Sequence, residues 1–161
     1  MAVSAYEVIA TTTLTTTQNQ VDFNSISGSY TDLVLVMGGG VTSGADIWLR
    51  MNGDTASNYS RTRLYGDGST LASSRNSSAS SIFVSVGVLG ANSVLITHIM
   101  NYSNTTTYKT AITRHNSSTY VSASVGLWRS TSAITSLTLK AEAADTFTSG
   151  STFTLYGIKA A

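Results

Sequence analysis

The sequence predicts an all-β protein, an antiparallel β-sandwich of the jelly-roll type with about ten strands. Three observations carry this prediction. Apolar and polar residues alternate with a period of two in most segments, which is the pattern of a strand with two different faces. Turn-forming residues separate these segments at short intervals, as in sandwiches and barrels. No segment shows sustained helical periodicity, and the chain of 161 residues is expected to form one domain, residues 1–161.

The composition narrows the classes of partner. Charged residues are 11% of the chain, and the net charge is +1. Without a cluster of Lys and Arg to displace phosphate counterions, a nucleic-acid partner is not expected. Cysteine is absent, which excludes disulfides and cysteine-rich zinc sites. No apolar run approaches the roughly 18 residues that cross a membrane, and residues 1–5 lack the pattern of a signal peptide. We expect neither a membrane partner nor a bound cofactor or metal.

The first third of the chain predicts three strands. Residues 6–10 and the threonine run 11–17 are β-prone, because threonine is branched at Cβ and suits a pleated surface. Residues 1–17 are therefore expected to form an N-terminal arm or an edge strand. A short strand at 21–23 follows. Residues 33–37 are apolar at every position, which predicts a central strand covered on both faces.

In the next segment Ile47, Leu49 and Met51 alternate with Trp48 and Arg50, which predicts a strand with one buried face.

After a turn at 52–54, residues 59–65 are expected to be a strand. The Gly- and Ser-rich stretch 66–80 is expected to be an irregular loop. The face expected in the strand after it consists of Ile82, Val84, Val86 and Val88.

Four further strands are expected near 94–102, 108–114, 121–127 and 135–141. Alternation groups two apolar faces in them, which we expect to be internal: Val94, Ile96, His98 and Met100 in one, and Val121, Ala123, Val125 and Leu127 in another. Residues 141–145 could form one turn of helix.

The last stretch, 152–158, alternates strictly and is expected to close the sandwich. Its expected neighbours are the strands at 6–10 and 33–37. Tyr156 is the polar-tipped aromatic residue that needs a partner there.

The candidate chemistry is sparse. We expect His98 to lie in the core or an interface and His115 to be solvated at a strand end, with no carboxylate placed by sequence beside either. Residues 52–55 with Asn58 offer oxygens, but they lack the carboxylates of a calcium loop and favour a turn. Residues 38–40 are three glycines without the Lys-Ser/Thr of a phosphate loop. We therefore predict that the protein is not an enzyme.

Aromatic side chains expected on outward faces are the better candidates for a site. We predict an interface formed by Tyr6, Trp48, Arg50 and Trp128, because exposed aromatic residues and arginine are enriched in protein interfaces. Two alternatives stay open at this point: a second packed face of the same sandwich, and stacking of these rings on sugars.

Short motifs along most of the chain resemble one family. They are YEVIA (6–10), YTDLVLV (30–36), MNGD (51–54), NYS (58–60), IMNY (99–102), TYK (107–109), WRSTSAI (128–134) and GSTFTLYGI (150–158). Their order is similar to that in small structural proteins of tailed bacteriophages, especially phages of aquatic bacteria and cyanobacteria. Members are described as tail-fibre, virion or capsid-decoration proteins. The resemblance implies a β-rich virion module, often trimeric, and transfers no catalytic residue.

The resemblance and the composition together predict a capsid decoration or cement protein located in the virion. It would be a homotrimer that binds and stabilises junctions of the major capsid protein. The alternative is a tail-fibre or receptor-binding module that recognises glycans on the host surface, with an aromatic platform near 52–59 or 75–78.

Overall fold

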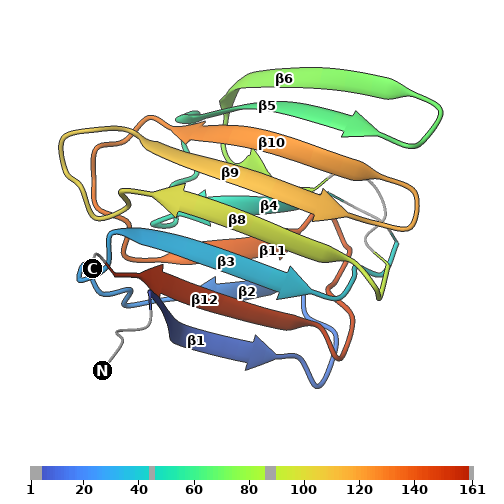
Figure 1. The fold of residues 1–161 in the computed structure, drawn as a ribbon, viewed down its shortest axis with the longest axis horizontal. Helices are drawn as coiled ribbons and strands as arrows, with labels where there is room; N and C mark the ends of the chain where they lie inside the picture. The colour runs from blue at the N-terminus through green and yellow to red at the C-terminus, as the bar shows by residue number, and fades with distance from the viewer. Residues whose placement is uncertain (1–4, 44–45, 86–89, 160–161) are drawn as a thin grey trace.

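A computed structural model describes residues 5–43, 46–85 and 90–159 (Figure 1). Its twelve strands form two antiparallel sheets. The eight-stranded sheet has the order β1-β12-β3-β8-β9-β10-β5-β6 and the four-stranded sheet the order β2-β11-β4-β7. In Figure 1 the larger sheet lies in front, and β2, β11 and β4 pass behind it. The predicted antiparallel β-sandwich is confirmed, with twelve strands instead of about ten; the jelly-roll arrangement stays a prediction.

The strands of the eight-stranded sheet, in spatial order, are β1 (Tyr6–Thr13), β12 (Thr152–Ile158), β3 (Asp32–Gly38), β8 (Val94–Met100), β9 (Lys109–Asn116), β10 (Val121–Trp128), β5 (Tyr59–Gly66) and β6 (Leu71–Ala79). Those of the four-stranded sheet are β2 (Gln20–Phe23), β11 (Leu137–Ala141), β4 (Ile47–Met51) and β7 (Ile82–Phe83). None of the described residues is helical, and this part of the chain therefore contains no helix long and apolar enough to cross a membrane.

The core lies between the sheets and draws on the inner side of nearly every strand. In β12, the buried residues Phe153, Leu155 and Gly157 alternate with more exposed threonines and Tyr156. In β4 and β11 the same period buries one side only. Each aliphatic side chain removed from water in this way contributes about 1.5–3 kcal/mol, so the shared core accounts for the association of the two sheets.

The last strand has the neighbours that the sequence predicts. β12 pairs with β1, with Tyr6 opposite Ile158, and with β3, with Leu35 opposite Leu155. The ring of Tyr156 meets that of Tyr6 edge to face, with the centroids 6.2 Å apart. Residues 6–13 are thus an edge strand of their own sheet, and Met1–Ser4 of the expected arm lie outside the described residues.

Gly157 is required in β12, because a Cβ atom at this position would come within 2.3 Å of the Tyr30 ring.

The expected loop at 66–80 is wrong in its larger part. Only a tight connection follows β5, in which Oδ1 of Asp67 accepts hydrogen bonds from the backbone of Ser69 and Thr70. The chain then forms β6, which pairs with β5 along its length. A serine-rich segment has only a weak preference for the strand conformation. Here the backbone pairing with β5 and a 2.8 Å hydrogen bond from Nε of Arg63 to Oγ of Ser74 stabilise the strand.

Two face assignments are reversed. In β8 the inner residues are Leu95, Thr97 and Ile99, whereas the expected core face that contains His98 points outward. His115, expected to be solvated, lies on the inner side of β9 and is only 6% exposed. β8 has apolar residues on both sides, so a period of two cannot decide which side is internal. His115 is buried because β9 extends to Asn116, beyond the expected end of the strand, and places this residue on the inner side.

Two smaller expectations also change. Only Ile82–Phe83 form β7; Val84 is buried beyond the strand, and Val86 and Val88 lie outside the described residues. Residues 141–145 make a turn, closed by a hydrogen bond from the Asp145 N–H to the Glu142 carbonyl, and not a turn of helix.

Candidate functional site: the outer face of the eight-stranded sheet

The side of the eight-stranded sheet that points away from the core is unusually apolar; we call it the outer face. The pairing register aligns one row of side chains across its strands, from Val125 through Ile112, His98, Val34 and Tyr156 to Val8. Val125 and Ile112 are 48% and 42% exposed, although β-branched residues of an antiparallel sheet normally lie on its covered side.

Few charged side chains interrupt this surface. On the described strands, the titratable groups of the outer face other than tyrosine are Asp32, Arg75, His98 and Arg114. Oδ1 of Asp32 already accepts a 2.6 Å hydrogen bond from the backbone N–H of Asn101. The outer face therefore combines exposed aliphatic groups with a slight excess of positive charge.

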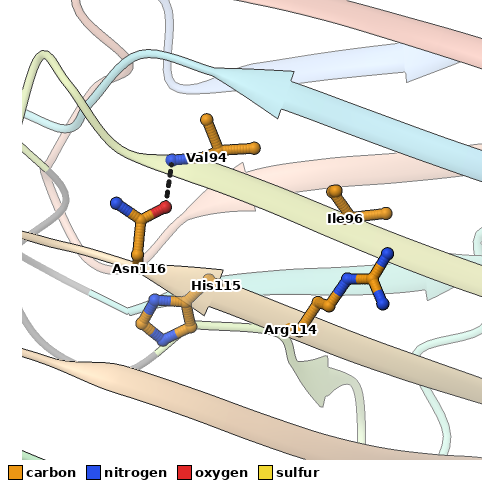
Figure 2. Close-up of a pocket in the computed structure, with 5 residues that line it drawn as sticks. All are labelled: Val94, Ile96, Arg114, His115 and Asn116. Atoms are coloured by element: carbon orange, nitrogen blue, oxygen red, sulfur yellow. Dashed lines mark hydrogen bonds between the residues drawn. The ribbon is translucent and has the colours of Figure 1, made fainter.

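A hollow of about 260 Å³ lies on this face between β8 and β9 (Figure 2). Val94 and Ile96 line it from β8, and Arg114 and Asn116 line it from the neighbouring strand, with His115 between them in sequence. The amide of Asn116 is oriented, since its Oδ1 accepts a 3.2 Å hydrogen bond from the backbone N–H of Val94. The hollow thus has one aliphatic side and one side of hydrogen-bond donors.

A second hollow, of about 330 Å³, lies two strands away between β10 and the β5–β6 pair. Leu64, Leu71 and Val121 line it, and they are 57%, 83% and 65% exposed. The Tyr65 and Tyr120 rings contact each other edge to face nearby, with their centroids 6.2 Å apart. The sequence prediction searched for outward aromatic residues and therefore missed this aliphatic surface. The sequence feature that could have indicated an apolar outer face is that both sides of the segment 94–100 are apolar.

The predicted interface residues do not come together. Tyr6 lies on the outer face and is half exposed. Trp48 and Arg50 point outward from the other sheet, where the Arg50 guanidinium stacks 4.2 Å from the Trp48 ring and its Nε donates to the Ser80 carbonyl. These two residues therefore lie on the opposite side of the sandwich from Tyr6.

The prediction that Trp128 points outward is wrong. The side chain is 2% exposed and stacks on Tyr59, and its Nε1 donates a 2.7 Å hydrogen bond to Oδ2 of Asp54. Trp128 does alternate with Val121 and Val125, as expected, but the valines are the outward residues. The period was correct and the assignment of the buried side was inverted.

The polar groups at 52–58 are used inside the protein. The Asn52 side chain donates to the Ala133 carbonyl and accepts from the backbone N–H groups of Thr135 and Ser136. Both Trp128 and Asn58 donate to Asp54, and although burial opposes the effect, these bonds lower the pKa of that carboxyl. The loop is a set of internal turns, as the sequence favoured, and it offers no exposed aromatic platform because Tyr59 is buried.

Partly buried ionisable groups form a separate cluster beside the middle of β5. Arg63 forms a 3.1 Å ion pair with Asp46, while Arg61 stacks 4.0 Å from the ring of Phe83. Burial, and then the charge of Arg63, lower the pKa of Arg61. Burial also lowers the pKa of His115. Within residues 5–43, 46–85 and 90–159, no three His, Asp or Glu residues are grouped closely enough to hold a metal ion.

Comparison with known proteins adds little. No family model matches the chain, and no curated protein matches it. Among solved structures, a galectin of Caenorhabditis elegans, LEC-6, shares 8% identity over 99% of both chains with a TM-score of 0.38. The alginate lyase Aly36B, solved with an alginate tetrasaccharide, shares 8% identity over 93% of this chain and 79% of its own, with a TM-score of 0.31. A human SPRY domain scores 0.23 at 8% identity, over 91% of this chain and 96% of its own. Likenesses this weak do not bear on function.

Proposed function

We propose that this protein is a non-enzymatic structural subunit that attaches to another protein through the outer face of its eight-stranded sheet. The observation that carries the proposal is the group of exposed aliphatic side chains on this face. They are Ile112 and Val125 on neighbouring strands, and Leu64, Leu71 and Val121 at the second hollow. Contiguous exposed apolar surface rimmed by polar residues is characteristic of protein–protein contact sites.

The dimensions of the face suit such a contact. Eight strands about 4.8 Å apart, each with about seven residues rising about 3.3 Å, make a surface of roughly 800 Å². A stable interface of standard size covers about 800 Å² on each partner. One partner could therefore be held by this face without a contribution from the four-stranded sheet.

The resemblance to phage structural proteins supplies the specific form of the proposal. In that setting the protein is a decoration subunit of the virion that binds junctions of the major capsid protein as a homotrimer, and it stabilises the shell by added buried area. A low-charge, hydroxyl-rich surface is consistent with this role, since its contacts depend little on ionic strength.

The test is cosedimentation of the purified chain with capsids of the phage that encodes it, depleted of this subunit. Ile112→Asp and Val125→Asp place charges in the apolar row, and we expect each to reduce capsid occupancy at least tenfold. Asn24→Asp is the matched control, because it adds one negative charge at an exposed position directly after β2 on the other sheet. If both aspartate variants, folded by circular dichroism, bind capsids like the parent, the proposal is wrong.

The second candidate is a glycan-binding tail module. The aromatic platform expected at 52–59 is absent, since Tyr59 and Trp128 are buried, and its absence disfavours glycan binding at this loop. What supports it is the exposure of Tyr6 and, elsewhere on the sheet, of Tyr108, since each ring could stack on a sugar. A glycan array tests it: binding that is lost in Tyr6→Ala or Tyr108→Ala would favour this function over capsid attachment.

A further inference from the structure

Two hydrogen-bond donors on the outer face lack an acceptor. The side chain of Arg114 is exposed and has no hydrogen-bond or ion-pair partner among the described residues. Asn116 lies two residues further along the same side of β9. Because its Oδ1 is bound to the Val94 N–H, its Nδ2 points away from Arg114, and it has no acceptor in the described part of the chain. Figure 2 shows both side chains at the same hollow, beside Val94 and Ile96.

Aliphatic surface flanks these donors on both sides. Towards β8 lies the hollow lined by Val94 and Ile96. In the opposite direction β10 places Ala123 beside Arg114 and Val121 beside Asn116, and the hollow of Leu64 and Leu71 begins there. Across the sheet, the donor of Arg114 therefore lies between two apolar surfaces.

The charges of the face argue against a second copy of this chain as the occupant. Arg75 and Arg114 are both exposed, and the acidic group on the described part of the face is Asp32, which is bound to the Asn101 N–H. Two such faces in contact would bring arginines together with little negative charge to oppose them, and like charges in contact disfavour an interface. Charge complementarity requires a partner that carries carboxylates.

We propose that the outer face binds a protein segment in which a carboxylate side chain is flanked by aliphatic or aromatic residues. The carboxylate accepts hydrogen bonds from the guanidinium of Arg114, and the side chains two residues before and after it, which lie on the same side of an extended segment, fill the two hollows. A guanidinium holds a carboxylate with directional, charge-assisted bonds, which makes Arg114 the specificity-determining residue. The inference rests on the proposed function and names the chemistry of the partner.

The probe is the capped pentapeptide N-acetyl-Leu-Ser-Asp-Ser-Leu-amide, in which both leucines can lie on the side of the aspartate, titrated into the ¹⁵N-labelled full chain and followed by NMR. N-acetyl-Leu-Ser-Asn-Ser-Leu-amide is the comparison, since it keeps the shape and loses the charge. We expect the aspartate peptide to shift the amides of residues 94–96, 114–116 and 121–123, and to bind at least fivefold more tightly than the asparagine peptide. Equal binding of the two peptides, or no shift at these residues, would overturn the inference.

Three variants locate the contact. Arg114→Gln removes the guanidinium. Asn116→Asp keeps an oxygen for the Val94 N–H and replaces the donor with a carboxylate. We expect each to weaken the aspartate peptide at least fivefold. Arg75→Gln is the matched control, because it removes the same charge from the same face on β6. If it weakens binding as much as Arg114→Gln does, general charge and not this site holds the peptide.

The outcomes separate this inference from the proposed function. If Ile112→Asp releases the chain from capsids while Arg114→Gln and Asn116→Asp do not, attachment through the face stands and the carboxylate site is wrong. Sedimentation of the free chain gives a further check. Self-association that Ile112→Asp abolishes and Arg114→Gln strengthens would identify a second copy as the occupant and overturn the inference.

Discussion

Nε1 of Trp128 donates a 2.7 Å hydrogen bond to Oδ2 of Asp54, which joins the end of β10 to the turn after β4. The same indole stacks on Tyr59, with ring planes 16° apart, and Asn58 donates to the same carboxylate oxygen at 2.9 Å. Trp128 therefore anchors the 52–58 turn to the larger sheet.

Removal of the Asp54 carboxylate is expected to destabilise the fold. Asp54→Ala leaves the buried Trp128 indole N–H without its acceptor, and the loss of such a partner costs about 1–3 kcal/mol of the free energy of unfolding. Urea denaturation measures it. Thr55→Ala, at an exposed position of the same turn, is the control and should change this free energy by less than about 0.5 kcal/mol. A parent-like midpoint for Asp54→Ala would show that the bond contributes nothing.

His115 should make the stability of the fold depend on pH. Burial lowers the pKa of His115, so the folded protein holds a neutral imidazole while the unfolded chain titrates near the ordinary value of about 6.5. Its contribution to stability is complete above about pH 6.5 and is lost as the pH falls below that value. We expect the midpoint of urea unfolding to decrease between pH 7.5 and pH 5.5. The decrease should be smaller in His115→Gln. An equal decrease in the parent and in His115→Gln would contradict this assignment.

Gly126 should not tolerate a larger residue. A Cβ atom at this position of β10 would come within 2.5 Å of Cγ2 of Ile82, where β7 crosses the sheet. Overpacking of this kind costs about 1–3 kcal/mol, so Gly126→Ala should lower the melting temperature. The double variant Gly126→Ala with Ile82→Val should recover part of the loss, because valine lacks Cδ1, a second atom of Ile82 that would lie 2.7 Å from the new Cβ. Thermal scans of the two single variants and the double variant measure the coupling; simple additivity would mean that the contact is absent.

The free energy of unfolding should decrease at alkaline pH because of Tyr59. Burial raises the pKa of Tyr59 to about 12, whereas an unfolded tyrosine titrates near about 10. The unfolded chain therefore loses its proton first, and stability falls as the pH rises from about 10 towards 12. Tyr59→Phe loses the hydrogen bonds to Met51 and should be less stable at pH 9. Its deficit should shrink at pH 11, as read from urea denaturation, and a constant deficit would refute this account.

Much of the architecture follows from local sequence. Strict alternation located β4, β11 and β12 and their buried sides, and the continuous apolar run located β3 between two neighbours. The partners of β12 were also predictable, since an early strand and a fully apolar strand were available. Where only one side of a strand is apolar, the pattern determines which side is internal.

The candidate site could not be predicted for the same reason that its face is unusual. β8 and β10 have aliphatic residues on their exposed sides, so Val121 and Val125 were assigned to the interior and Trp128 to the surface. The inner side of β10 has only Ser124, Gly126 and Trp128 on its buried positions, because Ile82 fills the space above the glycine. That contact depends on a strand in the other sheet, so it cannot be predicted from the sequence of β10 alone.

The position of β12 between β1 and β3 has a consequence for the order of folding. β1 is synthesised first and yet has β12 as its only neighbour in the sheet among the described residues. On the ribosome it has no partner in this sheet until residues 152–158 have emerged. Closing such a long loop is slow, and unpaired strand edges are prone to aggregate meanwhile. We therefore expect the sheet to be completed only after β12 has been synthesised, and truncations that remove β12 to leave β1 exposed and the product insoluble.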